Sequence, residues 1–357
     1  MLYPKPGFAA ISPRQEYQIC KRATEPNVLV LAAEGNSDDL DVPIEAAFAD
    51  AAFRRKARLG SVNSVNILRV LTQTAHIVWT YLRCSETDSD EVRFFVPTGA
   101  AGHLTSCMLA RKMGVNLRAT ACTNANEILV EFVEQGRLRA RDAVLSTLSP
   151  SMDIAVPYNI ERVLHLVSGG DAGLVRSWMH DFKAGKELEL GPDLHGALRG
   201  AFGVAATKTT DAEVLAAIRA YSLDAAPPIL LDPHTAVAAH AAKEALEGSD
   251  GLGGAAACVV MACAHPAKFP ETVVKAVAPA FASWAEVAAK AYGGQGDANP
   301  NQAVEDLEAH VGGEGGNFDA APGVVTLARG TDWTAGLQAA LEQAFPRISA
   351  WEAPAEA

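Results

Sequence analysis

The segment FFVPTGAAGH, which runs from Phe94 to His103, decides how the sequence is interpreted. It begins as a short apolar run, which is typical of a buried strand, and it turns at Gly99 and Gly102. Helical periodicity follows from Leu104 onward. Such a turn lets the backbone approach an anion closely and points the positive end of the helix dipole at it. The segment is therefore a candidate phosphate-binding loop. It matches neither a Walker A loop nor a dinucleotide fingerprint, and a plain strand-to-helix turn is the alternative.

The rest of the chain repeats this alternation of strand and helix. Short apolar or β-branched runs predict strands at Asn27–Ala32, Val92–Val96, Asn116–Cys122 and Ile229–Leu231. Apolar spacings of three and four predict helices at Val65–Tyr81, Leu104–Met113 and Ala125–Glu134. This order predicts an α/β fold, a doubly wound and mostly parallel sheet with helices on both faces.

The pattern also predicts how the chain is divided. Residues 1–158 form an α/β region, and residues 159–226, where no strand is predicted, form a helical insertion. The α/β pattern returns at 227–280, and 281–357 is a carboxyl-terminal region of uncertain structure. Residues 292–323 are rich in glycine, asparagine and aspartate and predict a loop, and 351–357 predict a frayed end.

Composition limits the classes of function. The chain has 357 residues and a formal net charge of -12, with no basic surface that would attract nucleic acid. Its densest basic run, residues 54–58, is interpreted as a solvated helix face. The six cysteines and nine histidines form no zinc-binding spacing, so we expect neither a metal site nor a disulfide framework. A small-molecule substrate is favoured.

Because the sequence shows no targeting signal, we expect the protein in the cytoplasm. The longest apolar run, Ala255–Ala264, is about half of the ~20 residues that a membrane span needs, so we expect no membrane contact. No secretory or transit pattern follows Met1. An organelle stays open if a leader precedes Met1, and the sequence sets no oligomeric state.

Seven blocks of sequence then occur in an order that resembles the threonine synthases, pyridoxal-phosphate (PLP) enzymes of fold type II, whose fold is similar to that of the tryptophan synthase β subunit. The blocks are SVNSVN at 61–66 with Arg69 and Gln73, PTG-x-x-G at 97–102, CTNAN at 122–126, LSPSMDI at 148–154, Asn159-x-Glu161-Arg162, LDPHTAV at 231–237 and ACAHPAKF at 262–269. The resemblance covers about Leu2 to Val274. It implies that 1–158 and 227–280 are parts of a PLP-binding domain.

The same resemblance implies that an expected element is missing from the sequence. In the family, a motif similar to His-Gly-Pro-Thr-x-Ala-Phe-Lys-Asp carries the Schiff-base lysine and precedes the LYPK segment, which begins here at Leu2. None of the 357 residues lies in such a motif, so no catalytic residue is predicted within the chain. We expect the fold to be incomplete at the amino terminus, either because the gene model starts too late or because the chain is a non-catalytic remnant with a binding role.

The resemblance implies two sets of cofactor contacts. Gly99, Ala100, Ala101, Gly102 and His103 match the loop that holds the cofactor phosphate, where the family usually has Gly-Asn-Phe-Gly-Asn. Backbone N–H groups remain available, but side-chain hydrogen bonds worth ~0.5–1.5 kcal/mol each are lost. Cys263 replaces a threonine that bonds the pyridine nitrogen, and a thiol is a weaker donor. Packing as a small apolar side chain is the alternative for Cys263.

The resemblance also implies a set of substrate contacts. These residues are Asn63, Ser64, Asn66, Arg69, Ser151, Asp153, Asn159 and Arg162. The guanidinium groups of Arg69 and Arg162 suit the carboxylate and phosphate of a phosphorylated amino acid. A surface ion pair is the alternative for Arg162, and packing at a helix start is the alternative to catalysis for His234.

The implied reaction converts O-phosphohomoserine and water to threonine and phosphate in threonine biosynthesis. A close relative in the family instead eliminates phosphate from phosphohomoserine or phosphothreonine and gives a ketoacid. Both reactions use the same residues, so the sequence leaves the choice open.

Overall fold

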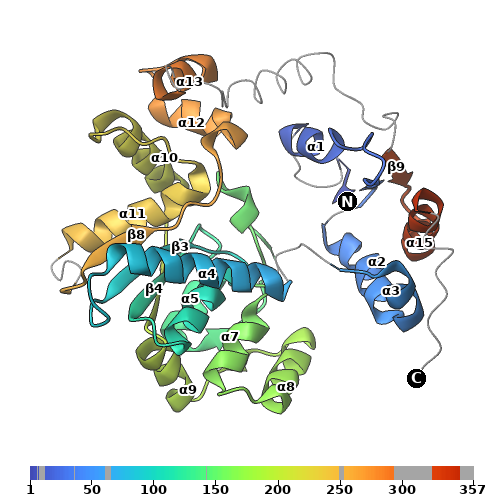
Figure 1. The fold of residues 1–357 in the computed structure, drawn as a ribbon, viewed down its shortest axis with the longest axis horizontal. Coiled ribbons are helices and arrows are strands. Elements are labelled where there is room, and N and C mark those ends of the chain that lie inside the picture. The colour runs from blue at the N-terminus through green and yellow to red at the C-terminus, as the bar shows by residue number, and fades with distance from the viewer. Residues whose placement is uncertain are drawn as a thin grey trace. The chain divides into compact units, whose positions relative to one another are not determined.

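The computed structural model describes residues 1–5, 7, 13–35, 37–60, 66–141, 143–248, 253–292 and 324–345. The chain divides into two compact units, Met1–Gly60 with Asp297–Ala357, and Ser61–Gly296. Figure 1 shows the helices and strands of both. This division differs from the predicted ranges, because the amino-terminal strands join the carboxyl-terminal segment instead of the region up to residue 158. Most of the predicted loop at 292–323 and the predicted frayed end at 351–357 lie outside the described residues.

The larger unit is organised around a sheet of four parallel strands in the order β7-β4-β3-β8. Their bounds are Val92–Pro97 (β3), Leu117–Thr123 (β4), Val204–Lys208 (β7) and Ala257–Val260 (β8). Phe95 pairs with Thr120 on one side and with Val260 on the other, so β3 is a central strand. Arg137–Leu138 (β5) and Leu188–Glu189 (β6) form a separate antiparallel pair.

Helices connect and cover these strands. The α-helices are Ile67–Cys84 (α4), Gly102–Lys112 (α5), Ile128–Gln135 (α6), Ile160–Val167 (α7), Ala172–Lys183 (α8), Pro192–Gly196 (α9), Asp211–Arg219 (α10), Pro233–Glu247 (α11), Pro270–Val277 (α12) and Trp284–Tyr292 (α13). Shorter helical segments are Pro150–Met152 (η1), Ala197–Ala201 (η2), Ala220–Asp224 (η3) and Pro266–Lys268 (η4). In the described residues, none of the helices is long and apolar enough to cross a membrane.

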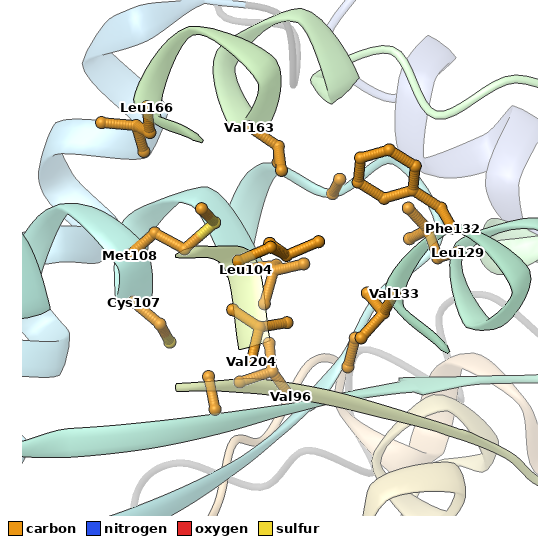
Figure 2. Packing of buried hydrophobic residues seen from close by; sticks show 14 of the residues in the cluster. Val96, Leu104, Cys107, Met108, Leu129, Phe132, Val133, Val163, Leu166 and Val204 are labelled. Atoms are coloured by element: carbon orange, nitrogen blue, oxygen red, sulfur yellow. The ribbon is translucent and has the colours of Figure 1, made fainter. Parts of the chain in front are cut away.

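The main core lies between the sheet and the helices α5, α6 and α7. Leu104 and Met108 of α5 are completely buried and pack in one cluster with Val96 of β3 and Val163 of α7. Figure 2 shows these side chains gathered between the sheet and α7, with Phe132 of α6 beside them. α5 follows β3 directly, so this packing also fixes the loop that joins them.

α11 covers the sheet from the side opposite α5 (Figure 1). Its first seven residues, Pro233–Ala239, are all buried, as are Ala241 and Ala242. The helix starts with proline at its first position, where the missing N–H costs nothing. Because five of these nine buried residues are alanine, much of the helix packs through short side chains.

The smaller unit has its own parallel sheet in the order β1-β2-β9, with bounds Leu2–Pro4, Val30–Ala33 and Val324–Leu327. Its helices are Pro13–Cys20 (α1), Ser37–Ala49 (α2), Ala51–Ala57 (α3) and Trp333–Ala344 (α15). Leu31, Phe53 and Leu337 pack in one of its cores, which brings together residues from both ends of the sequence.

Several predicted elements are confirmed. β3 and β4 occupy the predicted strands to within one residue at each end, and α4 and α5 occupy the predicted helices to within three. β2 begins at Val30, three residues later than predicted, and α6 begins at Ile128 instead of Ala125. The fold is α/β with mostly parallel sheets, as predicted.

Two predictions about strands are wrong. The run Ile229–Leu231 forms no strand, because it is a short extended connection that Asp232 ends by capping α11. The range 159–226 contains β7, which pairs with β4 in the central sheet. The residues of β7, VAATK, are small or polar and give only a weak strand pattern, and pairing with β4 decides their conformation.

We expect Leu104→Ala to lower the free energy of unfolding of the chain by about 2–5 kcal/mol, because Leu104 is completely buried in the core. Leu82→Ala on α4 is the matched control, since Leu82 is 64% exposed and its loss should change the free energy by less than about 0.5 kcal/mol. Urea unfolding monitored by circular dichroism measures both. Equal effects of the two substitutions would contradict the assignment of the core.

Candidate functional site

The order of the strands identifies a candidate site at the carboxyl ends of the strands of the larger sheet. From β3 the chain moves to β4 and then β7 on one side, whereas β8 pairs on the other side of β3. At such a switch point the loops leave neighbouring strands in opposite directions and open a crevice at the carboxyl ends of the strands. The loop from Pro97 to His103 follows β3, and the segment Met261–His265 follows β8. These two segments therefore flank the switch point, and the crevice expected between them is the candidate site.

The loop after β3 has the shape of an anion cradle. Ala101, the residue before α5, has a left-handed conformation with φ of 61°, and no side chain caps the helix. The N–H groups of the first turn of α5 therefore remain available to an anion at the positive end of the helix dipole. Ala101 is completely buried, so its side chain faces the core and not the crevice.

Two glycines of this loop are favoured by close packing. A Cβ atom on Gly99 would lie 3.1 Å from the Cα atom of Met152, and one on Gly102 would lie 3.1 Å from Nδ2 of Asn159. The backbone N–H of Asn159 donates to the carbonyl oxygen of Ala100 at 2.8 Å. The loop is therefore held against the segments 150–154 and 157–159.

His103 stands at the end of the loop and adds no positive charge to it. Burial, with a smaller contribution from His76, lowers the pKa of His103 to about 4, so its imidazole is neutral near pH 7. Its Nε2 atom is buried and has no hydrogen-bond partner among the described residues. Any attraction of the loop for an anion therefore comes from its backbone N–H groups.

The opposite wall of the crevice is organised by the buried carboxylate of Asp232, which precedes α11. Its Oδ1 atom accepts hydrogen bonds from the backbone N–H and the ring of His234, both at 2.9 Å. Its Oδ2 atom accepts from the hydroxyl of Thr235 and from the N–H of Ala264, the latter at 3.3 Å. Burial raises the pKa of Asp232, but these hydrogen bonds outweigh it and the pKa is lower than usual.

His234 extends this network to the other side of the crevice. Because the carboxylate of Asp232 can only accept, Nδ1 of His234 donates to it, and Nε2 accepts the N–H of Ser151 at 3.1 Å. The ring packs against Phe269 at 4.7 Å between centroids. Both ring nitrogens are occupied, so His234 positions the segment 150–152 and has the packing role that the sequence left open.

Cys263 lies where the network reaches the crevice. Its N–H donates to the hydroxyl oxygen of Thr235 at 3.0 Å. Solvent reaches the side chain, yet desolvation by the surrounding protein and the nearby Asp232 raise the pKa of the thiol to about 12. The thiol is therefore protonated near pH 7 and can donate a weak hydrogen bond to a group in the crevice.

Asp153 and Ser151 are held by the protein itself. Oδ1 of Asp153 accepts from the side chains of Asn124 and Thr147, both at 2.7 Å, and from Asn126 at 3.1 Å, while Oδ2 accepts the N–H of Thr147. This carboxylate orders the loop after β4, a role that the resemblance did not indicate. The backbone N–H of Ser151 donates to Nε2 of His234, and the side chain of Ser151 is exposed.

Of the other predicted substrate residues, Asn159 and Arg162 lie together. Nη1 of Arg162 donates to Oδ1 of the buried Asn159 at 2.6 Å, which connects the guanidinium to the Ala100 loop. Asn66 accepts the N–H of Leu68 at 2.9 Å and caps α4, and Arg69 is exposed one turn later. The predicted Asn63 and Ser64 lie outside the described residues.

Sequence reasoning missed two residues that build this site, Asp232 and Thr235. The signal was present as an aspartate followed by proline at a predicted helix start, which is the pattern of a helix cap. Its further partners, Cys263 and Ala264, follow some 30 residues later and could be found only from the fold.

The comparisons with known proteins agree with this geometry. Residues 235–294 match the family model described as threonine synthase, C-terminal. Human threonine synthase-like 2 is 37% identical over 281 residues, which are 77% of this chain and 56% of the human protein. The threonine synthase of Saccharomyces cerevisiae is 32% identical over 289 residues, 78% of this chain and 55% of that protein.

Solved structures give the same result. A crystal structure of PLP-bound threonine synthase from Brucella melitensis has a TM-score of 0.72 and 28% identity, and it covers 96% of this chain and 64% of that one. The yeast threonine synthase structure has a TM-score of 0.76 and 25% identity, and the match covers 97% of this chain and 64% of the yeast chain. The chain is a relative of the threonine synthases. Its fold is the PLP fold type II of these enzymes, and the chain spans little more than half the length of the curated relatives that it matches.

Threonine synthase ancestry implies PLP, and the described residues fit parts of this cofactor. The uncapped amino terminus of α5 suits its phosphate, and the protonated thiol of Cys263 suits its pyridine nitrogen. Lys208, at the end of β7, pairs with Glu127 at 2.7 Å, and Lys268 is exposed in η4.

We expect Asp232→Asn to lower the free energy of unfolding at pH 7 by about 1–3 kcal/mol, because the amide turns an NH₂ group toward buried donors. The pKa of Asp232 is lowered by folding, so its carboxylate stabilises the fold above about pH 4 and loses this contribution as the pH falls through the folded pKa. The difference between the wild type and the variant should therefore shrink in acid. Urea unfolding across pH 7 to about pH 3 measures it.

Asp171→Asn is the matched control, because Asp171 is an exposed cap of α8 and asparagine caps helices about as well as aspartate. An Asp232→Asn variant as stable as this control at every pH would show that the carboxylate does not hold the crevice together.

Proposed function

We propose that this chain contributes the phosphate-binding and substrate-binding parts of a PLP-dependent lyase that converts O-phosphohomoserine and water to threonine and phosphate. The observation that carries the proposal is the uncapped amino terminus of α5 at the switch point, with Cys263 across the crevice and Arg162 tied to the same loop through Asn159. Relatives named threonine synthase support it.

In this proposal each residue has a limited task. The backbone N–H groups of Gly102 and His103 hold the cofactor phosphate, and Cys263 donates to the pyridine nitrogen. The bound cofactor withdraws electrons from the substrate and makes its α-proton acidic. Arg162 holds an anionic group of the substrate, and Asn159 keeps the guanidinium in position.

The other reaction implied by the family resemblance, elimination of phosphate to give a ketoacid, would use the same residues. Analysis of the organic product separates the two reactions, since threonine and a ketoacid are resolved by chromatography. A third function, binding without catalysis, predicts ligand binding with no release of phosphate.

We expect the protein isolated from its native source to release phosphate from O-phosphohomoserine, and Arg162→Ala to lower kcat/KM about tenfold to hundredfold. This corresponds to the ~1.5–3 kcal/mol of a hydrogen bond to a charged group. Arg199→Ala is the control, because Arg199 pairs with Glu134 on the surface. A phosphate-release assay measures both, and unchanged kcat and KM in Arg162→Ala would remove this residue from the site.

We expect the purified chain of 357 residues to bind PLP reversibly and without a covalent lysine adduct, because no lysine stands in the family's motif. Inorganic phosphate should compete with PLP, and pyridoxal, which lacks the phosphate, should bind at least tenfold more weakly. Fluorescence titration and visible absorbance are the measurements. A stoichiometric visible band that disappears when one lysine is mutated would refute the prediction.

A further inference from the structure

A separate cavity lies between α7, α8, the outer part of α5 and the start of α4. Its volume is about 680 Å³, within the range of small-molecule sites. Thr105 and Leu109 of α5 line one wall, one to two turns beyond the anion cradle, and Ile67 of α4 lies at the edge. This cavity lies among helices, and it adjoins the site of the proposed function at Arg162, which lines it.

One face of α8 forms the opposite wall. The lining residues of this helix are Ala172, Val175, Arg176, Met179, His180 and Lys183. Their spacings of three, one, three, one and three residues place them on a single helix face. Val175 and Met179 form an apolar strip, and the cationic side chains of Arg176 and Lys183 lie along one side of it. The wall is therefore amphipathic.

The charge of the cavity is opposite to that of the protein. Arg162, Arg176 and Lys183 line it, and Glu161 is the only acidic residue among the described lining residues, although the chain carries a net charge of -12. Arg176 and Lys183 form no ion pair within the described part of the chain. The nearest acidic neighbour on α8, Asp181, pairs with Lys186 at 2.9 Å. The cavity therefore has unneutralised positive charge beside an apolar surface.

We propose that this cavity binds an amphipathic organic anion, a carboxylate, sulfonate or phosphate monoester attached to an apolar body. The anionic group pairs with Arg176 and Lys183, and the apolar body packs against Leu109, Leu166 and Met179. The proposal does not depend on the reaction proposed above. It places a ligand next to Arg162, whose guanidinium also bonds Asn159, so occupancy of the cavity acts on the loop at Ala100.

The test uses the full chain and two fluorescent probes of similar size, the anion 8-anilinonaphthalene-1-sulfonate and the neutral N-phenyl-1-naphthylamine. We expect saturable binding of one anionic probe per chain. Arg176→Glu combined with Lys183→Glu should lower the affinity for the anionic probe at least tenfold. The affinity for the neutral probe should change less than twofold. Both side chains are exposed, so the core is not disturbed. Arg199→Glu is the control and should bind both probes as the wild type does.

Hydrogen exchange with mass spectrometry locates the bound probe. We expect the anionic probe to slow exchange in peptides from α7 and α8. Val175→Trp, which occupies part of the apolar wall, should weaken the binding of both probes and reduce this protection. Absence of saturable binding, equal affinity in the double variant, or protection confined to the first turn of α5 would each overturn the proposal. Circular dichroism of each variant verifies that it is folded.

Discussion

The larger unit depends on one buried anion, the carboxylate of Asp232. It accepts hydrogen bonds from the start of α11 and from Ala264 after β8, and through His234 and Thr235 it holds Ser151 and Cys263. A buried carboxylate is tolerated only where donors surround it, because its desolvation costs several kcal/mol. The three segments must therefore adopt their positions together, and this requirement shapes the wall of the crevice.

The sheet supplies the other wall. β3 pairs with β4 and β8, and the loop after β3 leads into α5, whose Leu104 and Met108 lie in the centre of the core. The anion cradle is thus anchored by apolar packing below it, while the Cys263 side is anchored by hydrogen bonds. Two different kinds of interaction therefore meet at the carboxyl ends of β3 and β8.

The sequence predicted the parts that depend on local signals. The FFVPTGAAGH segment forms the strand, turn and helix that its pattern indicates, and the ordered blocks identify the family. Local sequence patterns do not predict which residues, distant in the sequence, a side chain will contact. Asp153 was predicted to face a substrate, yet its oxygens are occupied by Asn124, Asn126 and Thr147. β7 escaped prediction for the same reason, since its pairing with β4 decides its conformation.

The alanine-rich surface of α11 has a consequence for the disorder that folding removes. A long side chain gives up much rotational freedom when it is buried, whereas alanine has none to lose. At its five buried alanines α11 is therefore ordered at a small entropic cost, because these contacts are made by backbone and Cβ atoms that have no alternative rotamers. Asp232 is the cap that precedes the first turn of this well-ordered helix. Its carboxylate is therefore presented to its hydrogen-bond donors in one orientation.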